Sequence, residues 1–410
     1  GTSVTGGTIT VGDNAALGTG AVTINGGTVD LTTTTVTNAV TLVNGSLLNG
    51  TVDIATALNA QAGTISSVLS GLGSLSKTTN GILLLNGNNT YQGGTSLAAG
   101  TVTLGSATAL GSGLATLTGG TLDLNAQSIL NNVAVNGGTL TGGSLDVAQL
   151  TSLQSGTVLA ILTGTGGITK TTAGTLVLGG ANSYTGGVTI SGGTLTVSNA
   201  LALGDVSNAL NVAAGATVNL NGNTVVLGGL GAGTGTITAS TNSALTIAGA
   251  ASSTFAGLLS GTTSLTKSGS GTLTLTGANT YTLGTSVEGG TLSYANLGGL
   301  GAGAVAIGAG GTVSFTGANG TTTIPTVLTG AGTYQLVLAG ATASNTNLSG
   351  NLAGFTGTIQ VSGTGTFNKF NTNAFTGTGA TVTVDSGNTL FVPASIAFAG
   401  LNLVAVSYTH

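Results

Sequence analysis

The stretch LSKTTNGILLLNGNNTYQGGT, at 75–95, is written three times in this chain with the same internal spacing. The second copy, ITKTTAGTLVLGGANSYTGGV, occupies 168–188, and the third, LTKSGSGTLTLTGANTYTLGT, occupies 265–285. In each copy the lysine precedes the tyrosine by one fixed interval (91 − 77, 184 − 170 and 281 − 267 are equal). A frame kept over this length predicts a repeat protein whose similar units stack on one another.

A shorter motif, Gly-Thr followed by alternating apolar and polar residues, recurs along the chain. Alternation with β-branched side chains predicts short strands that bury one face. Neighbouring copies are evenly spaced, since the interval from 7 to 27 equals that from 100 to 120. We expect the apolar positions to form the core, among them Val29, Leu122, Leu195 and Leu292.

The residues between these strands are Asn-Gly, Gly-Gly and Ser-Gly pairs, which favour tight turns. Short strands at this spacing, with no helical pattern between them, predict an all-β fold. We expect a single-stranded right-handed parallel β-helix (β-solenoid), rod-like, with coils of about 20 residues. A propeller is disfavoured because its blades carry an aromatic signature, whereas aromatic residues make up only 3% of this chain.

The repeat pattern changes along the chain. We expect regular repeats over 1–320 and a degenerate continuation of the β-solenoid over 321–405. Both prolines, Pro325 and Pro393, fall in the second part, where they suit edges or turns. Gly1-Thr-Ser aligns with Gly94-Thr-Ser, so the sequence begins inside a repeat.

Composition excludes several classes of partner. Charged residues are 3% of the chain, whereas about 25% is typical of globular proteins. Only four basic residues and a net charge of −4 argue against a nucleic-acid partner. No stretch of about 20 predominantly apolar residues occurs, so we expect no membrane insertion by this segment. Cysteine is absent, which fits a secreted protein that needs no disulfides.

The combined frame of lysine, Asn-Thr-Tyr or Asn-Ser-Tyr, and a following Gly-Gly-Thr motif resembles the autotransporter-associated β-strand repeat. That repeat is found in the passenger regions of bacterial type V secreted proteins. The resemblance covers 1–320 well and the remainder loosely. It implies a β-helical passenger that is exported across the outer membrane and is cell-surface or extracellular. It also implies a native chain that continues to a C-terminal membrane barrel, whose long alternating strands do not occur here.

The sequence offers little for catalysis. It holds eight acidic residues, no arginine, and one histidine, the terminal His410. A β-helical polysaccharide lyase or hydrolase would need clustered carboxylates and usually a basic residue on one face. We therefore predict that the chain is not an enzyme, and we assign no catalytic residue, cofactor or cofactor-binding residue.

Two pairs of acids keep one spacing. Asp53 follows Asp30 by the same interval as Asp146 follows Asp123 (53 − 30 and 146 − 123), and the second pair lies one long repeat beyond the first. If neighbouring coils carried the two members of a pair, their carboxylates could share Ca²⁺, which takes oxygen ligands. The alternative, which we favour, is a solvated outward position for each acid, and we assign no metal site.

The polar residues of the repeat frame admit two interpretations. We interpret the asparagine that stands shortly before each tyrosine as a left-handed turn residue, at Asn89, Asn182 and Asn279. The tyrosine rings would cover the edge of a coil, at Tyr91, Tyr184 and Tyr281. The lysines would be solvated charges that discourage lateral strand pairing, at Lys77, Lys170 and Lys267. Contacts to a ligand are the alternative role for these groups.

These observations favour a structural stalk or adhesive passenger segment of a surface-displayed bacterial autotransporter. Its partner would be a host or cell-surface glycan or protein. The alternative is a β-helical glycan-binding or polysaccharide-degrading module. Scattered acids favour the stalk, whereas three or more acids in contact would favour the module.

The last five residues have a separate explanation. VSYTH, at 406–410, resembles the translation of a transposon-end adapter used in preparing sequencing libraries. We therefore expect 406–410 to be a sequencing-adapter artefact, and His410 to have no function.

Overall fold

The computed structural model describes residues 1–318, 322–324, 326–338, 344–363, 365–370, 379–386, 388–391, 400–403 and 407–409. The chain divides into two compact units, Gly1–Gly187 and Val188–His410. Pro325, Pro393 and His410 lie outside the described residues, as does Val406. Among the described residues no helix is both long and apolar enough to cross a membrane.

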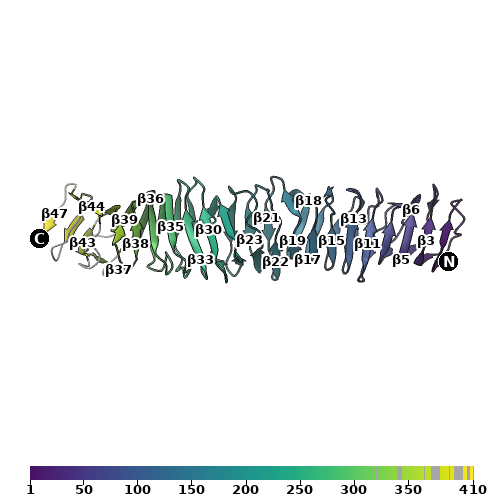
Figure 1. Ribbon diagram of the computed structural model, residues 1–410, viewed down its shortest axis with the longest axis horizontal. Coiled ribbons are helices and arrows are strands. Elements are labelled where there is room, and N and C mark those ends of the chain that lie inside the picture. The colour runs from purple at the N-terminus through teal and green to yellow at the C-terminus, as the bar shows by residue number, and fades with distance from the viewer. Residues whose placement is uncertain are drawn as a thin grey trace. The chain divides into compact units, whose positions relative to one another are not determined.

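The first unit consists of short strands and one 3-10 helix (Figure 1). Its elements are β1 (Thr2–Val4), β2 (Thr8–Thr10), β3 (Val22–Asp30), β4 (Thr35–Val36), β5 (Val40–Leu48), β6 (Thr51–Asp53), β7 (Leu58–Ala60), β8 (Gly63–Ile65), β9 (Val68–Ser70), β10 (Leu75–Lys77), β11 (Ile82–Leu85), β12 (Thr95–Leu97), β13 (Thr101–Leu104), β14 (Ala115–Leu117), β15 (Thr121–Asp123), β16 (Ser128–Ile129), β17 (Val133–Thr141), β18 (Ser144–Asp146), η1 (Val147–Gln149), β19 (Leu150–Val158), β20 (Ile161–Thr163), β21 (Ile168–Lys170) and β22 (Thr175–Leu178).

The second unit is built from strands in the same way. Its elements are β23 (Val188–Ile190), β24 (Thr194–Val197), β25 (Ala209–Val212), β26 (Thr217–Asn219), β27 (Thr224–Leu227), β28 (Gly229–Leu230), β29 (Thr236–Thr238), β30 (Ser243–Ile247), β31 (Ser253–Phe255), β32 (Leu258–Leu259), β33 (Thr263–Lys267), β34 (Thr272–Leu275), β35 (Thr285–Tyr294), β36 (Val305–Ala318), β37 (Thr322–Ile324), β38 (Leu328–Gly330), β39 (Thr333–Leu338), β40 (Ser344–Leu348), β41 (Gly354–Phe355), β42 (Thr358–Gly363), β43 (Gly365–Phe370), β44 (Thr381–Val384), β45 (Asn388–Phe391), β46 (Gly400–Leu403) and β47 (Ser407–Thr409).

Within the first unit, strands of successive coils pair in parallel. β12 pairs with β10 through Thr95 and Leu75, and with β14 through Thr95 and Ala115, so these two coils are equal in length (95 − 75 and 115 − 95). Other coils are shorter, because Val22 pairs with Val40 (40 − 22). Parallel pairing of each coil with the next confirms the predicted β-solenoid.

The second unit keeps the same parallel pairing with longer coils toward its end. Threonines follow one another in register across β34, β35, β36, β39, β42 and β44: Thr272, Thr291, Thr312, Thr333, Thr358 and Thr381. The step from Thr333 to Thr358 is longer than the step from Thr272 to Thr291 (358 − 333 against 291 − 272). Parallel pairing therefore continues beyond residue 321 in coils of less even length.

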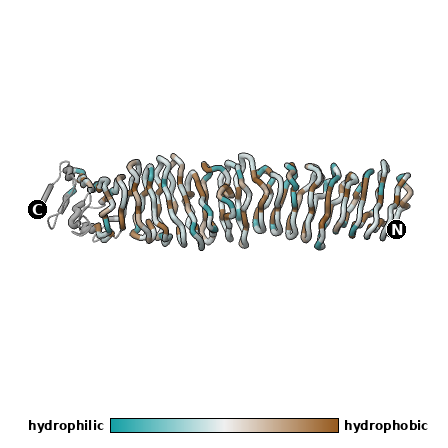
Figure 2. The backbone as a smooth tube through the Cα atoms, in the orientation of Figure 1, coloured by the Kyte–Doolittle hydropathy of each residue, from teal (hydrophilic) through white to brown (hydrophobic). Residues whose placement is uncertain are grey.

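The core of each unit is a set of aliphatic rows that run from coil to coil. Apolar residues recur from coil to coil along the coloured part of the tube in Figure 2. The four predicted core positions are confirmed, because Val29 and Leu122 are 1% exposed and Leu195 and Leu292 are 0% exposed. Strand alternation turns these side chains inward and leaves the intervening threonines at the surface.

Candidate functional site: the lysine, asparagine and tyrosine of the repeat frame

The three lysines of the repeat frame lie inside the solenoid. Lys77 and Lys170 are 0% exposed and Lys267 is 1% exposed. The interpretation of these residues as solvated charges is therefore wrong. Strand alternation explains this burial. Each lysine lies two residues after an inward-pointing leucine or isoleucine, and residues two apart in a strand point to the same face.

Each buried ammonium donates a hydrogen bond to a backbone carbonyl of the turn that follows. Lys77 Nζ donates to the Thr79 carbonyl at 2.5 Å, and Lys170 Nζ donates to the Thr172 carbonyl at 2.5 Å. Lys267 Nζ donates to the Gly269 carbonyl. Burial lowers the pKa of all three lysines below its usual 10.5, because desolvation disfavours the charged form. The lysine therefore closes the turn that follows its own strand.

Two of these turns also accept support from the preceding coil, which supplies a different glutamine for each turn. Gln61 Oε1 accepts hydrogen bonds from the backbone amides of Thr78, at 3.1 Å, and Thr79, at 3.0 Å. Gln154 Oε1 accepts from the backbone amides of Thr171 and Thr172, both at 3.0 Å. These glutamines lie outside the repeat motifs recognised in the sequence. Their signal was a shared interval before the lysine, since 77 − 61 equals 170 − 154.

The asparagines bind adjacent coils together instead of forming left-handed turns, so that interpretation is also wrong. Asn89 is 3% exposed, and its backbone is not among those with positive φ. Its Oδ1 accepts from the Leu69 amide at 2.8 Å, and its Nδ2 donates to the Ala109 carbonyl at 2.6 Å. Both partners are equally far from Asn89 in sequence, on the preceding and following coils. One side chain thus connects three successive coils.

The same bridge recurs in the third repeat, and its accepting half recurs in the second. Asn279 accepts from the Leu259 amide at 2.8 Å and donates to the Gly299 carbonyl at 2.7 Å. Asn182 accepts from the Leu162 amide at 2.9 Å. An amide side chain suits this place because it carries one acceptor and one donor group, as the two backbone partners require.

The tyrosine rings lie in the core and do not cover a coil edge. Tyr91, Tyr184 and Tyr281 are 0% exposed. The Tyr91 hydroxyl hydrogen-bonds Thr95 Oγ1 at 2.5 Å, and the Tyr281 hydroxyl hydrogen-bonds Thr285 Oγ1 at 2.5 Å. Burial raises the pKa of all three phenols well above its usual 10.0. These rings fill the core, and a threonine satisfies the hydroxyl of Tyr91 and of Tyr281.

The two acids of the first pair lie on strands of different sheets. Asp30 pairs along its strand row with Leu48, whereas Asp53 lies on β6, in a different sheet, and pairs with Ser70. Asp30 accepts from the Thr32 amide at 2.9 Å and from Asn49 Nδ2 at 2.7 Å. Hydrogen bonds from Asn49 and Thr32 lower the pKa of the Asp30 carboxyl. The Asp30 carboxylate therefore accepts hydrogen bonds from the turn that follows its strand and from the next coil.

The second pair has the same arrangement. Asp123 accepts from the Asn125 amide at 2.9 Å, and Asp146, on β18, accepts from the Ala148 amide at 2.9 Å at the start of η1. Across the described ranges, no group of three or more His, Cys, Asp or Glu side chains could hold a metal ion. The two acids of each pair thus end separate strands, and Asp30, Asp123 and Asp146 accept an amide of the turn that follows.

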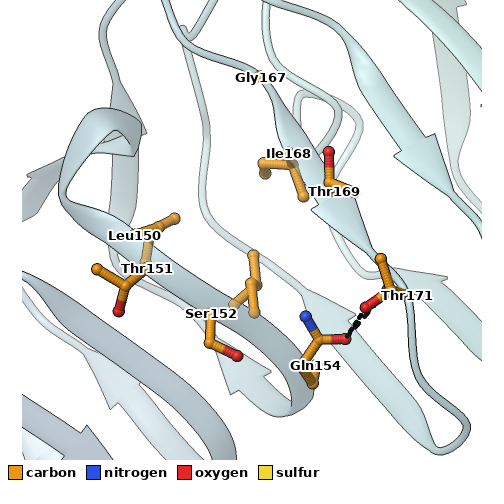
Figure 3. Close-up of a pocket in the computed structure, with 9 residues that line it drawn as sticks. Leu150, Thr151, Ser152, Gln154, Gly167, Ile168, Thr169 and Thr171 are labelled. Carbon is orange, nitrogen blue, oxygen red and sulfur yellow. Dashed lines mark hydrogen bonds between the residues drawn. The ribbon is translucent and has the colours of Figure 1, made fainter.

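One surface depression in the first unit is lined by neutral polar groups (Figure 3). Its volume is about 320 Å³, and its walls are residues 150–154 together with Gly167, Ile168, Thr169 and Thr171. Ser152 Oγ donates to Asn136 Oδ1 at 2.7 Å, and Thr171 Oγ1 donates to Gln154 Oε1 at 3.2 Å. The polar groups of this lining are hydroxyls and amides, with no charged or aromatic side chain among them. The depression offers hydrogen bonds but no acid or base for catalysis.

Comparison with known proteins identifies the repeat. The family model described as "Passenger-associated-transport-repeat" matches residues 75–104, 168–197 and 265–293, which contain the three lysine, asparagine and tyrosine frames. The chain is also similar to "Adhesin BmaC autotransporter" of Brucella suis biovar 1 (strain 1330), with 34% identity over 146 residues. That match covers 33% of this chain and 4% of the relative. No solved structure gave a significant match.

Both comparisons concern the same class of secreted protein. The matched repeat is named for its place in passengers, and the relative is an autotransporter. Passengers are the exported parts of such proteins, exposed at the cell surface beyond the outer membrane. The chain therefore carries three copies of the passenger-associated-transport repeat and is similar, over a third of its length, to an autotransporter adhesin.

Proposed function

We propose that this segment serves as a structural stalk or adhesive surface without enzymatic activity. The observation that carries the proposal is the use of the polar residues of the repeat frame. Lysine, asparagine and tyrosine all hydrogen-bond inside the stack, to backbone or threonine groups of their own or adjacent coils. The polar groups that repeat along the chain are thus engaged inside the stack instead of being presented at the surface as reactive groups.

The distribution of acids supports the same proposal. In the described part of the chain, several carboxylates accept a backbone amide of the turn that follows, at Asp13, Asp30, Asp123, Asp146 and Asp205. Scattered acids that shape turns are expected in a scaffold, whereas hydrolysis or elimination needs acids grouped around one bond. The adhesin name of the Brucella relative supports a partner on a host surface, either a glycan or a protein. The native chain would continue to a C-terminal membrane barrel.

The test is surface display. The chain is fused to a heterologous outer-membrane barrel, and cells that display it are compared with cells that display the barrel alone. We expect the displayed chain to be reached by antibody at the cell surface and to increase attachment to host cells or immobilised host glycoproteins. Attachment equal to the barrel-only control would contradict the adhesive role. Cleavage of a polysaccharide by the purified chain would contradict the non-enzymatic role.

A second candidate function, glycan binding, rests on the depression lined by residues 150–154, 167–169 and Thr171. Its hydroxyl and amide lining suits the hydroxyls of a neutral sugar, although it lacks the aromatic platform that sugars often stack on. Titration with neutral oligosaccharides tests it, using Thr169→Val to remove one exposed hydroxyl at constant shape. Thr175→Val, an exposed threonine outside the depression, is the matched control. Equal binding by the two variants, or none by the unmodified chain, would exclude this candidate.

A further inference from the structure

The buried lysines occupy positions that neighbouring coils fill with aliphatic side chains. Lys77 pairs with Leu97 on the next coil, and Leu97 pairs with Leu117 beyond it. Lys267 lies between Ile247 and Val287 in the same way. Each lysine therefore places an ammonium in a row that is otherwise apolar.

The charge of these lysines has no acidic partner among the described residues. Neither Lys77 nor Lys267 forms an ion pair there, and each ammonium bonds a carbonyl of its own turn. Burying a charge without a counter-ion is costly, and a well-packed apolar side chain in its place is often neutral or stabilising. The stability of the finished stack therefore does not explain why a lysine recurs here.

The following coil covers the ammonium. A Cβ atom placed on Gly100 would lie 2.5 Å from Lys77 Nζ, so the chain at Gly100 passes directly against the charge. The Ala98 amide donates to the Lys77 carbonyl at 2.9 Å, and the Thr101 amide donates to the Gly81 carbonyl at 2.9 Å. Before residues 95–101 dock, this face of the lysine is open to water.

The third repeat is built in the same way. The Thr291 amide donates to the Gly271 carbonyl at 3.2 Å, directly above the turn that Lys267 closes. Gly290, at φ +64°, would place a Cβ within 2.5 Å of the Gly269 and Gly271 carbonyls. A side chain at Gly290 would thus collide with the turn that holds the lysine.

We infer that Lys77 and Lys267 protect the open end of a partly folded stack from pairing with the open end of a second copy of this chain. An incomplete solenoid presents an unpaired strand row and an apolar interior, which together favour association with another chain. An inward-pointing charge at the last folded coil opposes that association, because a second copy would have to bury the ammonium. When the chain's own next coil docks, it covers the ammonium of Lys77. Gly100 lies against the ammonium in that coil and is small enough to fit there. The inference rests on the proposed function as a stalk or adhesive segment, and a stack that folds coil by coil passes through such incomplete forms.

Refolding of the purified full chain tests this inference. The double variant Lys77→Met, Lys267→Met removes both charges and keeps long unbranched side chains, and the chain is refolded by dilution from denaturant at several protein concentrations. Monomer yield is measured by size-exclusion chromatography with light scattering, and stability by denaturant unfolding. Leu97→Met, in the same row as Lys77 but uncharged, is the matched control.

We expect the double variant to unfold at an equal or higher denaturant concentration than the unmodified chain. We also expect its monomer yield to fall several-fold, with a loss that grows with protein concentration, while Leu97→Met refolds like the unmodified chain. A monomer yield equal to that of the unmodified chain at every concentration would overturn the inference. So would a clear loss of stability, which would make the lysines ordinary stabilising residues. Neither outcome depends on adhesion, so failure here is distinguishable from failure of the proposed function.

Discussion

Replacing Asn89 tests whether one side chain connects three coils. In Asn89→Ala, the Leu69 amide loses its acceptor and the Ala109 carbonyl loses its donor. Because Asn89 is 3% exposed, water does not readily replace either bond. Each unsatisfied buried group costs about 1–3 kcal/mol, so we expect a loss of about 2–6 kcal/mol in the free energy of unfolding.

A second variant separates the donor from the acceptor. Asn89→Asp retains an acceptor for the Leu69 amide but turns a carboxylate toward the Ala109 carbonyl, where a donor is needed. Burial raises the pKa of such a carboxyl above its unfolded value, so the charged form is the destabilising one. The variant should therefore be weakest at neutral pH and should recover as the pH falls through the raised pKa, when the protonated group can donate.

The assay combines denaturant unfolding with hydrogen exchange at residues 69 and 109 to 111. Hydrogen exchange reports local opening, which matters because a repeat protein can open one region before the rest. Asn88→Ala is the matched control, because Asn88 is the adjacent residue and is exposed. Its Oδ1 accepts only from hydroxyls of the next coil.

Two outcomes would refute the reasoning. The first is Asn89→Ala with the same stability and the same exchange as Asn88→Ala, which would mean that the two buried bonds contribute nothing. The second is Asn89→Asp with no gain in stability as the pH is lowered, which would mean that the side chain does not need to donate.

Three further predictions concern the core, a glycine and pH. Leu195→Asp should lower the free energy of unfolding by several kcal/mol, because it buries an unpaired charge. Thr196→Asp, at the outward neighbour, should be tolerated. Equal thermal unfolding of the two variants would mean that the inward and outward faces are assigned the wrong way round. Gly100→Ala should cost about 1–3 kcal/mol because φ is +72° and the methyl would meet Lys77 Nζ, whereas Gly12→Ala, with open space around its Cβ, should be near neutral in denaturant unfolding. Below pH 10.0 stability should rise with pH, because folding favours the neutral form of Lys77, and above pH 10.0 it should fall as tyrosines ionise in the unfolded chain, since burial raises the pKa of Tyr294 to about 12. Denaturant midpoints measured from neutral to alkaline pH would contradict this if they only declined.

Local side-chain rules were sufficient for the strands and the core. Alternation in the Gly-Thr motifs placed Val29 and Leu195 inward, because a strand turns successive side chains to opposite faces. The same rule applied to Leu75-Ser-Lys77 would have placed the lysine inward as well. We instead expected an exposed lysine, because lysine is rarely buried in proteins. That expectation fails at Lys77 because a carbonyl of the next turn accepts a hydrogen bond from the ammonium.

The acid pairs show where sequence spacing misleads. If the interval from Asp30 to Asp53 were one coil, Asp30 would pair with Asp53 on the next coil. It pairs instead with Leu48, which comes earlier in the chain. Coil length varies because the turns differ in length. Equal intervals in two repeats therefore show that the two pairs occupy equivalent positions, but they do not show that the two acids of one pair lie close together. Asp53 consequently lies on a different strand row from Asp30.

The repeat, the strands, the inward rows and the resemblance to autotransporter passengers can all be predicted from the amino-acid sequence, because each of them depends on residues close together in the chain. The roles of the polar residues of the repeat, by contrast, depend on how the coils stack. The partners of Asn89 lie one coil away on either side, and the chain at Gly100 covers Lys77 from the next coil. Such contacts exist only once coils stack, since stacking brings together backbone groups that no local pattern connects. The stack also supplies the carbonyl and amide groups that allow an ammonium and a carboxamide to be buried at all.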